Sequence, residues 1–128
     1  MKKASVIVVE KDNKILLINR YDSGKFGLPG GKSELNESPE QTAIRECFEE
    51  TGITVTKCSF LFSKVVLGEI NFEVHCFFAD QFNGEIIPSA EGSVHFMDKE
   101  FLINDKSAFP EYNKIVVEYL NNKLSSSN

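Results

Sequence analysis

Three glutamates follow one arginine closely near the middle of the chain. Glu46, Glu49 and Glu50 come directly after Arg45 in the stretch GKSELNESPEQTAIRECFEETGI. Carboxylates that converge in this way suit a hard divalent cation, because Mg²⁺ prefers oxygen ligands and is usually held by a few carboxylates, substrate phosphates and water. No histidine or cysteine pair near this stretch has the spacing of a zinc site. The residue types therefore predict a site for Mg²⁺.

The segment that carries these glutamates is predicted to be a helix that begins at Pro39 and ends before Gly52. Ser38 suits the N-cap, and Gln41 completes a capping box. Gly52 is the residue type that commonly adopts the left-handed conformation just past a helix end. At about 100° per residue, the apolar side chains of this helix gather on one side and the glutamates on the opposite side.

The glutamates are electrostatically unfavourable at this end of a helix. Glu46 and Glu50 are like charges one turn apart, which costs a few tenths of a kcal/mol. Glu49 and Glu50 also oppose the helix dipole, at about 0.3–1 kcal/mol each. The alternative interpretation is a solvated charged face. We favour a functional site, since sequences usually tolerate such conflicts where function requires them.

Strand-like runs and a glycine-rich loop surround the predicted helix. The loop runs from Tyr21 to Lys32, and its glycines indicate sharp turns or a close approach to another group. A second helix is predicted to start at Phe109-Pro110. The chain is expected to form one domain, residues 1–124, with a disordered tail at 125–128. The predicted strands are Ser5–Glu10, Lys14–Arg20, Thr54–Leu67, Glu69–Asp80 and Ser93–Met97, the first two forming a hairpin.

Composition narrows the possible partners. The 128 residues carry a net charge of −5, which makes nucleic acid an unlikely partner because a broad polyanion-binding face would be basic. Three unpaired cysteines fit a reducing compartment, and the first apolar run, Val6–Val9, is too short for a signal peptide or a membrane span. A cytoplasmic protein is expected, and the sequence leaves open whether it is a monomer or a homodimer.

Residues 31–53 resemble the Nudix box, G-x5-E-x7-R-E-U-x-E-E-x-G-U, in which U is a bulky apolar residue. The preceding LLINRYDSGKFGLPGGK also looks like the strand and loop before the box in Nudix hydrolases. The resemblance implies an α/β fold, with a mixed β-sheet in an α/β/α sandwich. The matching positions are Gly31, Glu37, Arg45, Glu46, Cys47, Glu49, Glu50, Gly52 and Ile53.

The resemblance also implies the chemistry. Nudix hydrolases cleave a nucleoside diphosphate linked to another moiety, with Mg²⁺ or Mn²⁺ as cofactor. Glu46, Glu49 and Glu50 would be metal ligands, with Glu49 or Glu50 also a candidate base for the attacking water. Arg45 would hold a catalytic carboxylate in place.

Two further box residues would have structural roles, by the same resemblance. Glu37 would brace the turn between loop and helix, and Gly52 would end the helix. Gly31 would allow a tight backbone and offer its carbonyl oxygen to the metal.

A further acidic ligand is expected on a later loop, as in many relatives. Glu91 is our candidate, although Ser93 lies nearer to where some relatives keep an acidic residue, and a surface glutamate is the simpler alternative. His75 and His95 are expected to be ordinary strand residues rather than catalysts.

Contacts to the substrate are expected from the glycine-rich loop and its flanks. Arg20 and Lys25 carry the positive charge that phosphates require, and Gly30 and Gly31 bring the backbone close. A phenylalanine such as Phe26, Phe72 or Phe78 has the shape to stack on a base, although core packing is the simpler interpretation for any one of them.

The substrate is predicted by elimination. No proline lies between Pro39 and Pro88, and no tyrosine between Tyr21 and Tyr112, whereas relatives that cleave ADP-ribose or diadenosine polyphosphates often carry these residues downstream of the box. A nucleoside triphosphate, cleaved in the MutT-like manner to a monophosphate and pyrophosphate, is therefore favoured. Nucleotide sugars, ADP-ribose, the 5′ end of RNA, or a silent nucleotide-binding module remain alternatives.

Overall fold

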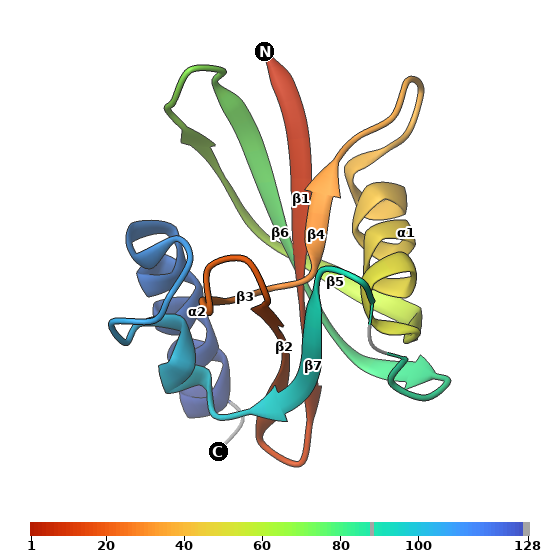
Figure 1. The fold of residues 1–128 in the computed structure, drawn as a ribbon, viewed down its shortest axis with the longest axis vertical. Helices are drawn as coiled ribbons and strands as arrows, with labels where there is room; N and C mark the ends of the chain where they lie inside the picture. Colours follow the sequence, from red (N-terminus) through yellow and green to blue (C-terminus); the bar gives the residue numbers. More distant parts are fainter. Residues whose placement is uncertain (88, 127–128) are drawn as a thin grey trace.

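A mixed β-sheet lies between two helices in the computed structural model, which describes residues 1–87 and 89–126, with side chains up to Lys123 (Figure 1). This arrangement confirms the α/β/α sandwich. The elements are β1 (Lys2–Lys11), β2 (Lys14–Arg20), β3 (Phe26–Gly27), β4 (Gly30–Lys32), α1 (Pro39–Thr51), β5 (Thr54–Val66), β6 (Phe72–Asn83), β7 (Gly92–Met97), the 3₁₀ helix η1 (Lys99–Leu102) and α2 (Pro110–Ser126).

Strand β1 is the centre of the sheet. It pairs in parallel with β6 along most of its length and in antiparallel with the short β4. The predicted hairpin with β2 is present, with Asp12 and Asn13 at positive φ in the turn. However, β1 and β2 pair only beside the turn, because β2 then pairs with β7 and β3 instead.

The two faces of β1 pack against different helices. Successive strand residues point to opposite faces, so Ile7 and Val9 pack against Ala43 and Cys47 of α1. Val8 packs on the other face in the cluster that contains Val116 and Leu120 of α2. Helices α1 and α2 accordingly cover opposite sides of the sheet (Figure 1).

The ends of α1 follow the predicted caps. The Ser38 hydroxyl accepts a hydrogen bond from the Gln41 backbone N–H at 3.1 Å, and the Gln41 side chain accepts one from the Ser38 N–H at 2.9 Å. Such a cap stabilises a helix by about 1 kcal/mol. Gly52 has φ 82° and its N–H bonds to the Phe48 carbonyl. A side chain at Gly52 would also meet the Glu85 carbonyl, so glycine is required there for two reasons.

Two predictions about the chain's loops and end need revision. The glycine-rich loop contains the short strands β3 and β4, which its composition concealed because glycine is a poor strand former. Helix α2 continues to Ser126, so the predicted tail at 125–128 begins inside the helix, and 127–128 lie outside the described residues. Among the described helices, none has the length and apolar character needed to cross a membrane.

Candidate functional site

Two glycines of β4 bring the backbone against α1. The Gly30 N–H donates a 2.8 Å hydrogen bond to Oε1 of Glu50. A Cβ atom at Gly31 would lie 2.5 Å from the Glu46 carboxyl carbon, so only glycine lets this carboxylate rest on the strand. A Cβ atom at Gly30 would likewise overlap the backbone of β1. The paired glycines therefore place two carboxylates of α1 against one short strand.

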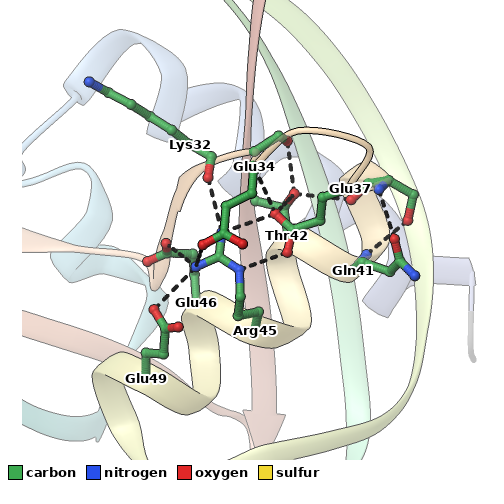
Figure 2. A network of polar contacts seen from close by, with 10 residues as sticks. Lys32, Glu34, Glu37, Gln41, Thr42, Arg45, Glu46 and Glu49 are labelled. Atoms are coloured by element: carbon green, nitrogen blue, oxygen red, sulfur yellow. Dashed lines mark hydrogen bonds and ion pairs between the residues drawn. The ribbon is translucent and has the colours of Figure 1, made fainter.

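Arg45 is the centre of a network of carboxylates (Figure 2). Its Nε and Nη2 donate to the two oxygens of Glu37 at 2.7 and 3.0 Å. Its Nη1 donates to Glu46 at 2.8 Å and to Glu49 at 3.2 Å. The forked geometry of a guanidinium is suited to such paired contacts. Arg45 thus fixes the direction of glutamates that would otherwise repel one another.

Glu37 ties the loop before α1 to the helix itself. Besides Arg45, it accepts hydrogen bonds from the Glu34 backbone N–H at 3.0 Å and the Thr42 hydroxyl at 2.8 Å. The bond from Arg45 and that from Glu34 lower the Glu37 pKa to about 2. Glu37 thus connects Glu34 of the preceding loop with Thr42 and Arg45 of the helix.

Glu50 has a different environment from its neighbours. Glu49 is 54% exposed, whereas Glu50 is partly buried beneath the loop. Burial is the main reason why the Glu50 pKa is raised to about 7. The charges of Glu46 and Glu91 also raise it, whereas the hydrogen bond from the Gly30 N–H and the charge of Arg20 lower it. Before a cation binds, Glu50 therefore holds a proton at a higher pH than an ordinary glutamate does.

Glu91 reaches the same region from a distant part of the chain. Arg20 at the end of β2 pairs with Gly92 at the start of β7, and the Tyr21 N–H bonds to the Glu91 carbonyl at 3.0 Å. The Glu91 charge acts on Glu50. The Arg20 pKa is raised chiefly by the hydrogen bond to Asp22, and the Glu91 charge adds a smaller contribution. The alternative position, Ser93, instead bonds to His95 at 2.9 Å.

The donor set fits a hard divalent cation in its chemistry. Every candidate donor is an oxygen, as Mg²⁺ and Mn²⁺ prefer. As the described side chains lie, no three acidic, histidine or cysteine groups are arranged to hold an ion together. Arg45 engages Glu46 and Glu49, and Gly30 engages Glu50. A bound cation would therefore share these carboxylates with their present partners.

A pocket of about 300 Å³ opens beside the carboxylates on the α2 side of the sheet. Its walls are mostly apolar, and its polar groups include Glu50 and Asn113. The side chain of Asn113 is buried and donates a 3.0 Å hydrogen bond to Ser107. The lining comprises Ala4, Ser5, Val6, Ile18, Arg20, Gly27, Leu28, Gly30, Gly31, Lys32, Glu50, Val66, Phe72, Val74, Ala108, Phe109, Tyr112 and Asn113.

The predicted substrate residues divide into two groups. Arg20, Gly30 and Gly31 line the pocket, although the Arg20 guanidinium is paired with Asp22 at 3.1 Å. Lys25 is exposed and is not among the described lining residues.

The phenylalanines divide in the same way. Phe72 lines the pocket, with the Lys32 ammonium 5.5 Å from its ring centre. Phe26 and Phe78 lie in the core.

Sequence reasoning missed Lys32 and Asn113. The signal for Asn113 was a polar residue on the first turn of the second helix, between Tyr112 and the apolar Ile115 and Val116. A polar residue on the buried stripe of a helix requires a partner or a ligand.

Comparisons with known proteins agree with this geometry. A family model described as the NUDIX domain matches residues 1–116. An uncharacterized Nudix hydrolase, YvcI, of Bacillus subtilis is 32% identical over 86% of this chain and 72% of its own length. The crystal structure of a MutT protein from Bacillus halodurans has a TM-score of 0.76 and 28% identity, covering 90% of this chain and 79% of that one.

Curated relatives with named substrates match over shorter stretches. The 8-oxo-dGTP diphosphatase of Proteus vulgaris is 40% identical over 45% of this chain and 55% of its own length. The ADP-ribose pyrophosphatase of Methanocaldococcus jannaschii is 51% identical over 36% of this chain, but the match spans only 29% of that protein.

Proposed function

The chain belongs to the NUDIX domain family and is a Nudix hydrolase, and from this premise we propose that it cleaves nucleoside triphosphates to a monophosphate and pyrophosphate. Mg²⁺ is the proposed cofactor, with Mn²⁺ as a substitute. The observation that carries the proposal is that Glu50 and Asn113 line the same apolar pocket.

The pocket has the chemistry to hold a nucleobase. Phe72, Phe109 and Tyr112 line it with aromatic surface, which suits the flat face of a base. The Asn113 amide is both a donor and an acceptor, and can therefore bond to the polar edge of a purine or pyrimidine. A base in this pocket would direct its phosphates toward Glu50 and Arg20.

The carboxylates bind the cations and promote the reaction at the phosphates of the substrate. Glu46, Glu49, Glu50 and Glu91 would hold the divalent cations, which neutralise charge on the phosphates and acidify water. Glu50 accepts the proton of the attacking water, as a carboxylate beside a bound cation can. Arg45 keeps Glu46 and Glu49 aligned. Lys32 and Arg20 offer positive charge to the phosphates.

The names of relatives support a nucleoside triphosphate as substrate and suggest ADP-ribose as a second candidate. Several are named 8-oxo-dGTP diphosphatases, and one is named an ADP-ribose pyrophosphatase. Both names describe cleavage within a nucleoside diphosphate unit. We favour the triphosphate because the sequence lacks the downstream proline of many ADP-ribose enzymes.

A substrate panel with product identification tests the proposal. With Mg²⁺ present, dGTP, 8-oxo-dGTP, dATP, ADP-ribose, a uridine diphosphate sugar and diadenosine tetraphosphate are compared by kcat/KM. We expect a triphosphate to be the best substrate, with monophosphate and pyrophosphate as products. A higher kcat/KM for ADP-ribose or for the dinucleotide, or release of inorganic phosphate from the triphosphate, would contradict the proposal.

A further inference from the structure

A row of four residues crosses the sheet on the face that α1 covers. Ser5 of β1 pairs with Gly31 of β4 on one side and with His75 of β6 on the other, and His75 pairs with Ser63 of β5. Directly paired strand residues point to the same face. That face is the α1 side, because Ile7, two residues beyond Ser5, packs against α1.

Charged groups lie beside two positions of this row, Gly31 and His75. Over Gly31, the Glu46 carboxylate rests where a side chain would otherwise be. Next to His75 on the same strand face, Oε1 of Glu73 lies 3.1 Å from Nε2 of the imidazole. The row therefore connects a box glutamate with a histidine–carboxylate pair of the neighbouring strand.

Two buried polar atoms in the middle of the row have no hydrogen-bond partner among the described residues. They are Oγ of Ser5, whose residue is 0% exposed, and Nδ1 of His75. Buried polar groups are nearly always paired, with protein or with ordered water. Their neighbouring positions in the row indicate a common partner.

We propose that one internal water molecule bonds to Ser5 Oγ, His75 Nδ1 and Glu46, and so makes Ser5 and His75 positioning residues for this glutamate. Buried waters typically make about three hydrogen bonds to such groups. On the Glu46 side the partner is Oε2, because Arg45 already donates to Oε1.

The hydrogen-bond directions are mutually consistent. A carboxylate only accepts, so Glu73, 3.1 Å from Nε2, favours the tautomer with its proton on Nε2, which leaves Nδ1 as an acceptor. The water can donate to Nδ1 and to Glu46 Oε2 while it accepts from the Ser5 hydroxyl. Each group at the site is thereby satisfied, and Glu46 is held from two sides.

A high-resolution crystal structure of the metal-free protein tests the water directly. We expect an ordered water within hydrogen-bond distance of both Ser5 Oγ and His75 Nδ1. A dry site, with the Ser5 hydroxyl bonded to a backbone carbonyl, would overturn the inference. This result does not depend on the reaction, whereas the positioning of Glu46 rests on the proposed function.

Paired substitutions test the effect on Glu46 through Mn²⁺ binding, measured by calorimetry without substrate. Asparagine retains a polar atom near the position of Nδ1, and glutamine one near Nε2. We expect Ser5→Ala and His75→Gln to weaken Mn²⁺ binding by about tenfold, as loss of a group that orients a metal ligand commonly does. His75→Asn should retain most of the affinity.

Ser63→Ala is the matched control, because Ser63 lies in the same row on the far side of His75. It should bind Mn²⁺ as the parent does. For Ser5→Ala, kcat should fall with little change in KM. If Ser5→Ala raised the melting temperature and left Mn²⁺ affinity unchanged, Ser5 would be only a tolerated buried hydroxyl and the inference would fail. Failure of the substrate panel with the Mn²⁺ differences intact would contradict the proposed function alone.

Discussion

The two faces of the sheet differ in how their polar groups are used. On the α1 face, Arg45 binds three glutamates in one network, and the capped helix fixes their positions. On the α2 face, an apolar pocket contains few polar groups, among them the buried Asn113. The faces meet at Gly30, whose N–H bonds to Glu50. Under the proposed function, one face carries out the reaction and the other selects the substrate.

Replacing Glu50 should produce the largest effect on activity. Glu50→Gln removes the proposed base and a ligand, so kcat should fall by about 10²–10⁴-fold. The metal-free variant should be at least as stable as the parent at pH 8, because burial disfavours the Glu50 charge. Thermal unfolding and kcat measure the two effects, and Glu118→Gln, an exposed change on α2, is the control. Parental kcat in Glu50→Gln would refute the assignment.

Replacing Arg45 should affect both stability and activity. Arg45→Ala leaves Glu37, Glu46 and Glu49 without their shared partner, at a cost of about 2 kcal/mol in unfolding free energy. Arg45→Lys keeps the charge but loses the fork, so it should recover part of the stability and little of the activity. Urea unfolding and kcat separate the two. Full activity in Arg45→Lys would show that charge alone suffices.

Asn113 should matter for substrate choice rather than for the reaction. Asn113→Ala removes the buried amide, so kcat/KM should fall by about tenfold or more for the best triphosphate and less for poor ones. Mn²⁺ affinity should stay at the parental value. Asn122→Ala, on the exposed side of the same helix, is the control. An equal loss for every substrate would place Asn113 in the scaffold instead.

The smallest expected effect is a difference in KM between variants of Lys32 and Lys25. Lys32 lines the pocket beside Phe72, whereas Lys25 is exposed outside it. Lys32→Ala should raise KM a few-fold, as expected for loss of one solvent-accessible charge contact to a phosphate. Lys25→Ala should leave KM unchanged. If Lys25→Ala raised KM and Lys32→Ala did not, Lys25 would be the phosphate contact, as its place in the loop predicts.

The α1 face was largely predictable from sequence, and the α2 face was not. Caps, the terminal Gly52 and the spacing of the glutamates are local signals, and each predicts its own structure. The pocket instead combines residues of β1 to β6, α1 and α2, which only the tertiary fold brings together. Lys32 therefore had no local signal, and the polar position of Asn113 predicts a buried partner but not the site that it shares. The strands β3 and β4 were missed because their glycines indicate a loop.

The most direct test of the central claim is a pH series of Mn²⁺ titrations of the metal-free protein by calorimetry. The Glu50 pKa is about 7, raised from its ordinary value of 4.5 by burial. Below pH 7 a proton occupies Glu50 and competes with the cation, so Mn²⁺ affinity should rise with pH and level off above about pH 8. The Glu50→Gln variant should bind Mn²⁺ weakly, and its Mn²⁺ affinity should not change between pH 6 and pH 8. An absence of Mn²⁺ binding by the parent across this range would contradict the account.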